Sequence, residues 1–262
     1  MSRLNIIFLF AFLVTMNSWA QNNHNYKVTY QTKIIKPQKK NNTKEDKTIS
    51  AEEKAANRYK EIIFNDYLYS MVAISELKII ENQSTYKTRK TLDEDEIKAS
   101  VRNFFNSITK NSGEYYYNLK TNEELLAKNT FGKDFLIFNQ RNSISWTITK
   151  DKKTICNFIC YKATATLKVK NAVNKGAKKK VTVWFTQSIP VSFGPFDYSG
   201  LPGLILEVNV TSNYGSILTT ANKVDLNVKE LKIKAPTKGK KVSLEEYEKI
   251  SRNLLKKGSY LN

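Results

Sequence analysis

Histidine is almost absent from this chain of 262 residues, which contains only His24. A Ser-His-Asp or Cys-His site needs an oriented imidazole, and a zinc hydrolase needs two or three histidine or carboxylate ligands. His24 stands near the N-terminus, where chains are poorly ordered. No GxSxG, HExxH, P-loop or GxGxxG motif occurs. We therefore predict no enzyme activity and no catalytic, cofactor-binding or metal-ligating residue. A two-carboxylate mechanism stays open because Asp and Glu are abundant, but nothing singles out one pair.

Cysteine is scarce too, and the two that occur are Cys156 and Cys160. An even number in an exported chain favours a disulfide. Four steps along a straight strand span about 13 Å, which is beyond disulfide reach. A tight hairpin turn at residues 157–159 would bring the two side chains face to face. Two separately packed thiols and a two-thiolate metal site are the alternatives.

Long apolar runs are missing except at the N-terminus. Residues 1–20 combine a positive charge at Arg3, an apolar stretch from Ile6 to Val14, and Ser18 and Ala20 at the −3 and −1 positions of a cut before Gln21. The apolar stretch is short for a membrane span, although a retained anchor is the alternative. No cysteine lies near the cut, which disfavours a lipoprotein. We predict a signal peptide and a periplasmic or secreted protein that does not span the membrane after cleavage.

Acidic residues are too few to balance the basic ones, since 43 Lys+Arg face 24 Asp+Glu for a net charge of +19. Only six of the basic residues are arginines. Nucleic-acid sites favour the bidentate arginine fork, so this composition and export together argue against a nucleic-acid partner. The scattered lysines either reflect a generally Lys-, Asn- and Ile-rich composition or attract an anionic surface.

Several segments alternate apolar and polar residues, as half-buried antiparallel strands do. The clearest are 26–34, 143–149, 161–170 and 181–187, and shorter strands are expected at 77–80, 114–119 and 135–138. Helical spacing follows a capping box at Ser50, continues in 92–108, and follows a second box at Ser243. The predicted class is α+β, a mainly antiparallel, curved sheet with about three helices packed on one face or end. The predicted organisation is a signal peptide at 1–20 and a single β-rich domain at 21–262, with a polar connector at 36–49 and a C-terminal helix at 243–257.

Proline and glycine are also rare, five and nine in number, yet two prolines and three glycines crowd between Gly194 and Gly203. Pro202 and Gly203 fit a type II turn, in which Gly203 would take the positive φ that the third position requires. A strand from Leu204 and a hairpin turn at 213–215 follow. The segment is predicted to be an irregular crossing between two strands. It is either a packed corner or a rigid surface loop that presents Asp197 and Tyr198 to a partner.

The six residues of this segment that matter most read GLPGLI, namely Gly200, Leu201, Pro202, Gly203, Leu204 and Ile205. They resemble the hexapeptide that names the GLPGLI family, exported proteins of Bacteroidota. The resemblance spans roughly residues 26–257, and its further matches are Phe135-Leu136-Ile137, Trp146, Ile155…Cys160…Ala163, Trp184-Phe185-Thr186, Ile189-Pro190 and Gly194-Pro195. Val183 stands where alanine is usual, and Cys156 is extra, so a disulfide would be private to this chain. The resemblance implies a periplasmic or secreted location and provides no established function or catalytic residue.

Two functions from different classes remain. The first is a non-enzymatic binding or accessory protein of the cell envelope, whose partner would be another envelope protein, an anionic surface or an apolar ligand. The alternative is an enzyme that works through carboxylates or tyrosines. A convergent Asp/Glu pair in a concave pocket would favour the enzyme, and a smooth apolar groove without buried acids would favour the binding protein.

Overall fold

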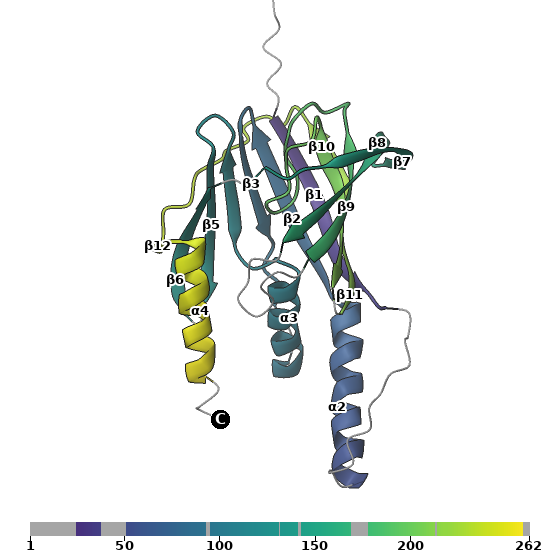
Figure 1. Ribbon diagram of the computed structural model, residues 1–262, viewed down its shortest axis with the longest axis vertical. Helices are drawn as coiled ribbons and strands as arrows, with labels where there is room; N and C mark the ends of the chain where they lie inside the picture. The colour runs from purple at the N-terminus through teal and green to yellow at the C-terminus, as the bar shows by residue number, and fades with distance from the viewer. Residues whose placement is uncertain are drawn as a thin grey trace, which may run out of the picture.

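The computed structural model describes residues 25–37, 51–92, 95–130, 132–140, 143–168, 178–212 and 214–258. The predicted signal peptide, His24, residues 38–49 of the predicted connector and the N-cap at Ser50 lie outside this part of the chain. Within it, twelve strands form a single sheet, and three helices gather at one end of that sheet (Figure 1).

The strands follow the chain almost in order across the sheet. The order is β12-β6-β5-β4-β3-β2-β1-β11-β10-β9-β8-β7, and every neighbouring pair is antiparallel except β12 with β6. The bounds are β1 (Asn25–Ile35), β2 (Val72–Ile80), β3 (Gln83–Thr88), β4 (Glu114–Asn118), β5 (Glu123–Thr130), β6 (Lys133–Gln140), β7 (Thr147–Ile155), β8 (Phe158–Lys168), β9 (Lys178–Thr186), β10 (Leu204–Ser212), β11 (Gly215–Leu226) and β12 (Lys240–Ser243).

The alternation in the sequence determines which face of each strand is buried. In β1, Tyr26, Val28, Tyr30 and Ile34 are buried, and the lysines between them lie on the other face. Because consecutive side chains of a strand point to opposite faces, this pattern fixes the register with β2 and β11 on either side. The prediction that these apolar residues share one buried face of the strand is confirmed.

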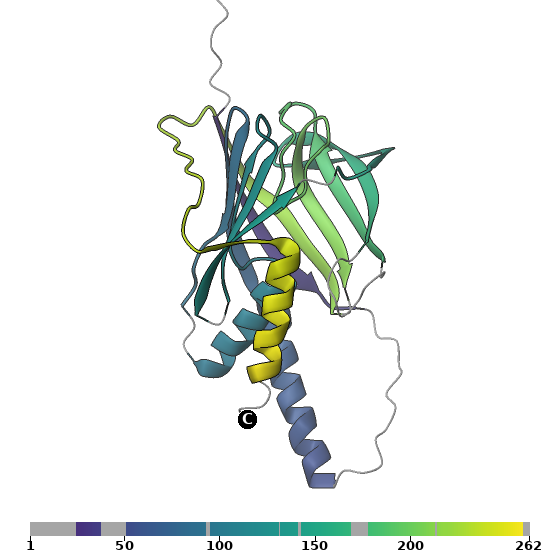
Figure 2. The ribbon, with the colours of Figure 1, turned by 60° about the vertical axis from the view of Figure 1, so that its left-hand side comes forward.

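The sheet is strongly curled, and its main core lies on the inner side of the curl (Figure 2). Buried side chains of β1, β2, β3, β8, β9 and β10 meet there. The space between them is filled by the segment that connects β9 to β10, which contributes Ile189, Phe193, Phe196, Tyr198 and Leu201. On the outer side, residues 227–239 run along β4–β6, and Ile233 and Ala235 pack on Tyr116, Leu125 and Leu136.

The helices are α2 (Ala51–Ser70), α3 (Glu96–Ile108) and α4 (Leu244–Gly258). Asp95 caps α3 by accepting a hydrogen bond from the Lys98 backbone N–H at 2.6 Å. The predicted capping box of α4 is confirmed, because Ser243 and Glu246 exchange backbone and side-chain hydrogen bonds of 2.8 and 3.1 Å. In the part of the chain that the structure describes, no helix has both the length and the apolar character to cross a membrane.

The predicted α+β class is wrong, because the fold is mostly β with minor helices. Three strands were not expected, β3, β5 and β12, and they extend the sheet well beyond the predicted set. The helices do not form a layer across the sheet. Instead α2 and α3 pack a small core with Ile34, Ala73 and Ile217, and α4 packs on β6, β12 and Leu126 of β5 at the edge of the sheet. The sheet covers its own inner face by curling around the β9–β10 connection.

Candidate functional site

The connection between β9 and β10, residues 187–203, is a packed corner. Its backbone is tied to the start of β10 by hydrogen bonds from Leu204 to Ile189 and from Ile205 to Phe193, both 3.0 Å long. Phe193 and Tyr198 are 1% and 3% exposed. The prolines and glycines therefore fix the path of a segment whose main contacts are with the core.

Gly203 is required for a reason different from the predicted one. The glycine of the hexapeptide with a positive φ is Gly200, at 91°, and Gly203 has an ordinary φ. A Cβ on Gly203 would overlap the Thr186 carbonyl oxygen and lie 2.7 Å from its carbon. The predicted type II turn with Gly203 at positive φ is thus wrong. Close approach of two backbones selects glycine at this position.

Asp197 and Tyr198, the predicted partner contacts, belong to a tight turn from Pro195 to Tyr198. Phe196 takes a φ of 58°, which is unusual for a bulky residue, and its ring packs on Tyr86, Tyr115 and Tyr198. Tyr198 is buried among these rings, so it is not presented at the surface. Asp197 alone reaches solvent.

Asp197 is bound to Lys110, which follows the C-terminus of α3. The ammonium lies 2.9 and 3.0 Å from the two carboxylate oxygens and 5.4 Å from the centre of the Tyr198 ring. Burial alone would raise the pKa of Asp197, but the Lys110 charge outweighs it and lowers that pKa. Both side chains keep more than a third of their surface exposed, so water screens the pair.

The two cysteines lie on the β7–β8 hairpin, and both are free thiols. The turn is formed by Cys156 and Asn157, both at positive φ, rather than by residues 157–159. Cys160 is therefore opposite Lys153. The Cys156 thiol donates to the Ala221 carbonyl at 3.3 Å, and the buried Cys160 thiol donates to the Phe158 carbonyl at 3.5 Å.

A groove of about 650 Å³ lies between α3 and the strands β3–β6, and no sequence pattern predicted it. One wall is formed by residues 88–92, which lead into α3, and by Ala99, Arg102, Asn103 and Asn106 of the helix. These helical positions are spaced by three or four residues, so they share one face. The opposite face of α3 buries Val101 and Phe105 against α2 and the sheet.

The groove is basic. Its lining includes two acids, Glu114 and Asp134, and six basic side chains, Lys87, Arg89, Lys90, Arg102, Lys128 and Lys238. Lys87 binds Glu114 and Lys238 binds Asp134, each at 2.7 Å. Both acids of the lining are thus neutralised by lysines of the lining.

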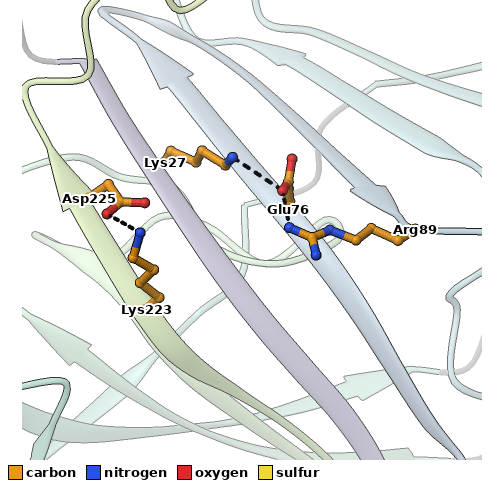
Figure 3. A network of polar contacts seen from close by, with 5 residues as sticks. All are labelled: Lys27, Glu76, Arg89, Lys223 and Asp225. Carbon is orange, nitrogen blue, oxygen red and sulfur yellow. Dashed lines mark hydrogen bonds and ion pairs between the residues drawn. The ribbon is translucent and has the colours of Figure 1, made fainter.

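Arg89 is held by an acid outside the groove. Its guanidinium lies 2.6 Å from the carboxylate of Glu76 on β2, which the Lys27 ammonium also approaches at 3.3 Å (Figure 3). A separate ion pair, Lys223 with Asp225, lies on β11, two strands away from β2. The hydrogen bond from Arg89 lowers the pKa of Glu76. Lys90 and Lys128 have no acidic partner in the described part of the chain, so they supply positive charge that the groove itself does not neutralise.

The groove does not contain a convergent pair of acids. Glu114 and Asp134 each face their own lysine, and the described residues contain no group of three His, Cys, Asp or Glu able to hold a metal ion. The buried tyrosines of the inner core, Tyr86, Tyr115 and Tyr198, have pKa values raised by burial, that of Tyr198 to about 12. At neutral pH these tyrosines stay protonated.

Sequence reasoning missed the groove because its walls come from segments between Ala73 and Lys238. One signal was available. In the helix at 96–108, Arg102, Asn103 and Asn106 form a polar stripe at helical spacing opposite the apolar one. That stripe places basic and amide groups on one face of the helix but does not reveal what faces them.

Comparisons with known proteins do not establish a function for this chain. Residues 170–207 match the family model "Protein of unknown function (Porph_ging)". Two solved structures of PNGF-II, in space groups C2 and P21, are similar to 87% of this chain at 14% and 15% identity, with TM-scores of 0.48 and 0.46. The chain spans about a third of the length of these structures, 32% and 33%. No curated protein matches it.

Proposed function

We propose that this chain is a non-enzymatic binding protein of the cell envelope that holds an anionic ligand in the basic groove beside α3. The observation that carries the proposal is the uneven lining, in which six basic side chains surround two acids. Clefts lined by charge of one sign raise the local concentration of ligands of the opposite sign. The overall charge of +19 acts in the same direction.

The state of the acids and tyrosines supports binding over catalysis. A general acid and base pair needs two carboxylates that converge on a substrate with separated pKa values. Glu114 and Asp134 are instead each bound to a lysine at 2.7 Å. Tyr198 and Tyr115 hold their protons more strongly than a free tyrosine because they are buried.

Export and family membership are part of the same proposal. The N-terminal pattern of residues 1–20 and the hexapeptide at 200–205 support an exported protein of the GLPGLI type. Edman sequencing of the protein from its native host should start at Gln21. A protein found in the cytoplasm with Met1 or Ser2 at its N-terminus would contradict the proposed location in the cell envelope.

A titration of the mature protein with inorganic polyphosphate, a generic polyanion, tests the groove. We expect binding that weakens steeply with salt and falls at least about tenfold in the double variant Lys90→Glu/Lys128→Glu. The matched control is Lys33→Glu/Lys60→Glu, which changes the net charge equally at exposed sites outside the groove. Equal loss in both variants would mean that the groove has no special role. Turnover of a phosphate, glycoside, ester or peptide substrate that one Asp or Glu substitution abolishes would favour an enzyme.

A further inference from the structure

We infer that the ligand of the basic groove is an acidic oligosaccharide, a hydroxyl-rich chain that carries several carboxylate or sulfate groups. This inference rests on the proposed function, since it specifies the anion that the same groove binds. Three features of the groove carry it: its size, the kind of cations that remain without an acid, and the neutral polar groups of its lining.

The groove is too large for a small inorganic anion. Its volume is about 650 Å³, which is within the range of roughly 300–1,000 Å³ of sites that bind drug-sized ligands. A single phosphate or sulfate would leave most of this space filled with solvent.

The cations that have no acidic partner among the described residues are lysines on opposite walls, although the Lys128 ammonium also lies 5.9 Å from the centre of the Tyr247 ring. Arg89 is bound to Glu76 at 2.6 Å, and Arg102 donates to the Val72 carbonyl at 3.3 Å. Both guanidinium forks, which recognise phosphate bidentately, therefore already have partners in the protein. Lys90 lies in the segment before α3, whereas Lys128 lies on β5. Two point charges on separate walls fit a ligand whose negative charges are spread along its length.

Neutral hydrogen-bonding groups line the same groove. Thr91 and Asn103 are exposed in the groove wall and make no side-chain hydrogen bond within the described residues. The Oδ1 atom of Asn106 is enclosed without a partner there, and a turn of the amide would let it accept from an O–H donor. Amides and hydroxyls both donate and accept, as sugar hydroxyls do. A fully ionised phosphate can only accept.

The lining argues against the other anionic polymers and surfaces. Nucleic acids without base pairing stack on aromatic side chains, and the one aromatic residue of the described lining, Phe135, is 3% exposed. Lipids need room for acyl chains, and the apolar lining is mainly alanines, with Leu92 97% exposed to solvent. A saccharide requires neither feature.

The test compares four probes by isothermal titration of the mature protein at one salt concentration. They are an oligogalacturonate of six units, its methyl-esterified neutral form, inorganic polyphosphate, and vesicles containing phosphatidylglycerol. We expect the oligogalacturonate to bind at least about tenfold more tightly than each of the others. Lys90→Ala/Lys128→Ala should weaken oligogalacturonate and polyphosphate alike, whereas Thr91→Ala/Asn103→Ala should weaken the oligogalacturonate several-fold and by more than it weakens polyphosphate, which can only accept from these side chains. Lys33→Ala/Lys60→Ala is the control for charge.

The outcomes separate this inference from the proposed function. Tightest binding of polyphosphate or vesicles, lost in the lysine variant, would overturn the saccharide and keep an anion-binding groove. Equal affinity for the neutral and acidic saccharides would also overturn it. Binding of none of the four probes, or binding that no groove variant changes, would overturn both. Circular dichroism and melting of each variant show that a lost signal is not unfolding.

Discussion

Gly203 lies so close to the backbone of Thr186 that a side chain at this position would overlap the Thr186 carbonyl group. This contact joins the end of β9 to the start of β10, the two strands between which the buried connection runs. The hexapeptide is therefore conformationally demanding at two different points. Gly200 provides a positive φ, and Gly203 provides the absence of a Cβ.

Gly203→Ala should destabilise the protein by about 3 kcal/mol or more, the upper end for overpacking, because the methyl group meets backbone and must push two strand ends apart. Gly203→Val should cost more than that. For a domain of this size, each kcal/mol lowers the melting temperature by about 2–4 °C. Thermal denaturation followed by circular dichroism measures the shift.

The control is Gly132→Ala. Gly132 has a φ of +75° and no atom within 4 Å of a built Cβ, so it reports backbone strain alone, about 1–2 kcal/mol. A Gly203→Ala variant that melts with or above Gly132→Ala would contradict the close approach.

Local sequence patterns correctly predict the elements whose structure depends on residues close by in the sequence. The alternation in β1 and the capping box at Ser243 both appear as expected, because each depends on neighbours within a few residues. The same holds for the apolar stripe of α3 that contains Val101 and Phe105. In each case the pattern reflects one face that must be buried.

Local sequence patterns do not predict the elements whose structure depends on contacts between residues distant in sequence. The segment of β5, EELLAKNT, contains good helix formers and no β-branched residue before Thr130. It forms a strand because β4 and β6 pair with it on both sides. The same holds for Gly203. The turn pattern predicts glycine there for a positive φ, but the actual reason is the backbone of Thr186, which leaves no room for a Cβ and is distant in sequence. The groove was not predictable either, because its charged side chains come from α3, from four strands, β3–β6, and from loops, which the fold brings together.

Tyr198→Ala should cost about 3–5 kcal/mol of stability, because it removes a fully packed ring and leaves a cavity among Tyr115, Phe196 and their neighbours. Tyr198→Phe, which keeps the ring, is the control and should stay within about 0.5–1 kcal/mol of the parent. Urea unfolding monitored by fluorescence measures both. A Tyr198→Ala protein as stable as the parent would support a recognition loop in place of a packed corner.

Cys156 and Cys160 should both react with iodoacetamide once the protein is denatured without reductant, giving two labels by mass spectrometry. In the folded protein, labelling should be slow at pH 8, because burial raises the pKa of Cys160 to about 11 and also raises that of Cys156. The protein must be prepared from its native host without reductant, so that any disulfide formed there is preserved. A mass without labels would establish the disulfide that the even cysteine number predicts.

The ion pair of Lys110 and Asp197 should stabilise the fold by less than about 1 kcal/mol at pH 7, because both groups are exposed enough to be screened. The pKa of Asp197 is lowered by folding, so its contribution is present above the unfolded value near 3.9 and is lost as the pH falls through the folded pKa. The pKa of Lys110 is raised, because Asp197 outweighs the effect of burial. Its contribution is therefore present below about 10.4 and is lost only as the pH rises through the folded value.

A double-mutant cycle with Lys110→Met and Asp197→Asn measures the coupling of this pair directly. Urea denaturation at low ionic strength should give a small coupling energy at pH 7 that disappears as the pH falls through the folded pKa of Asp197. Added salt should reduce it at pH 7 as well. A coupling of several kcal/mol, or one that persists when the carboxylate is protonated, would mean that packing against the Tyr198 ring, rather than charge, holds Lys110 in place.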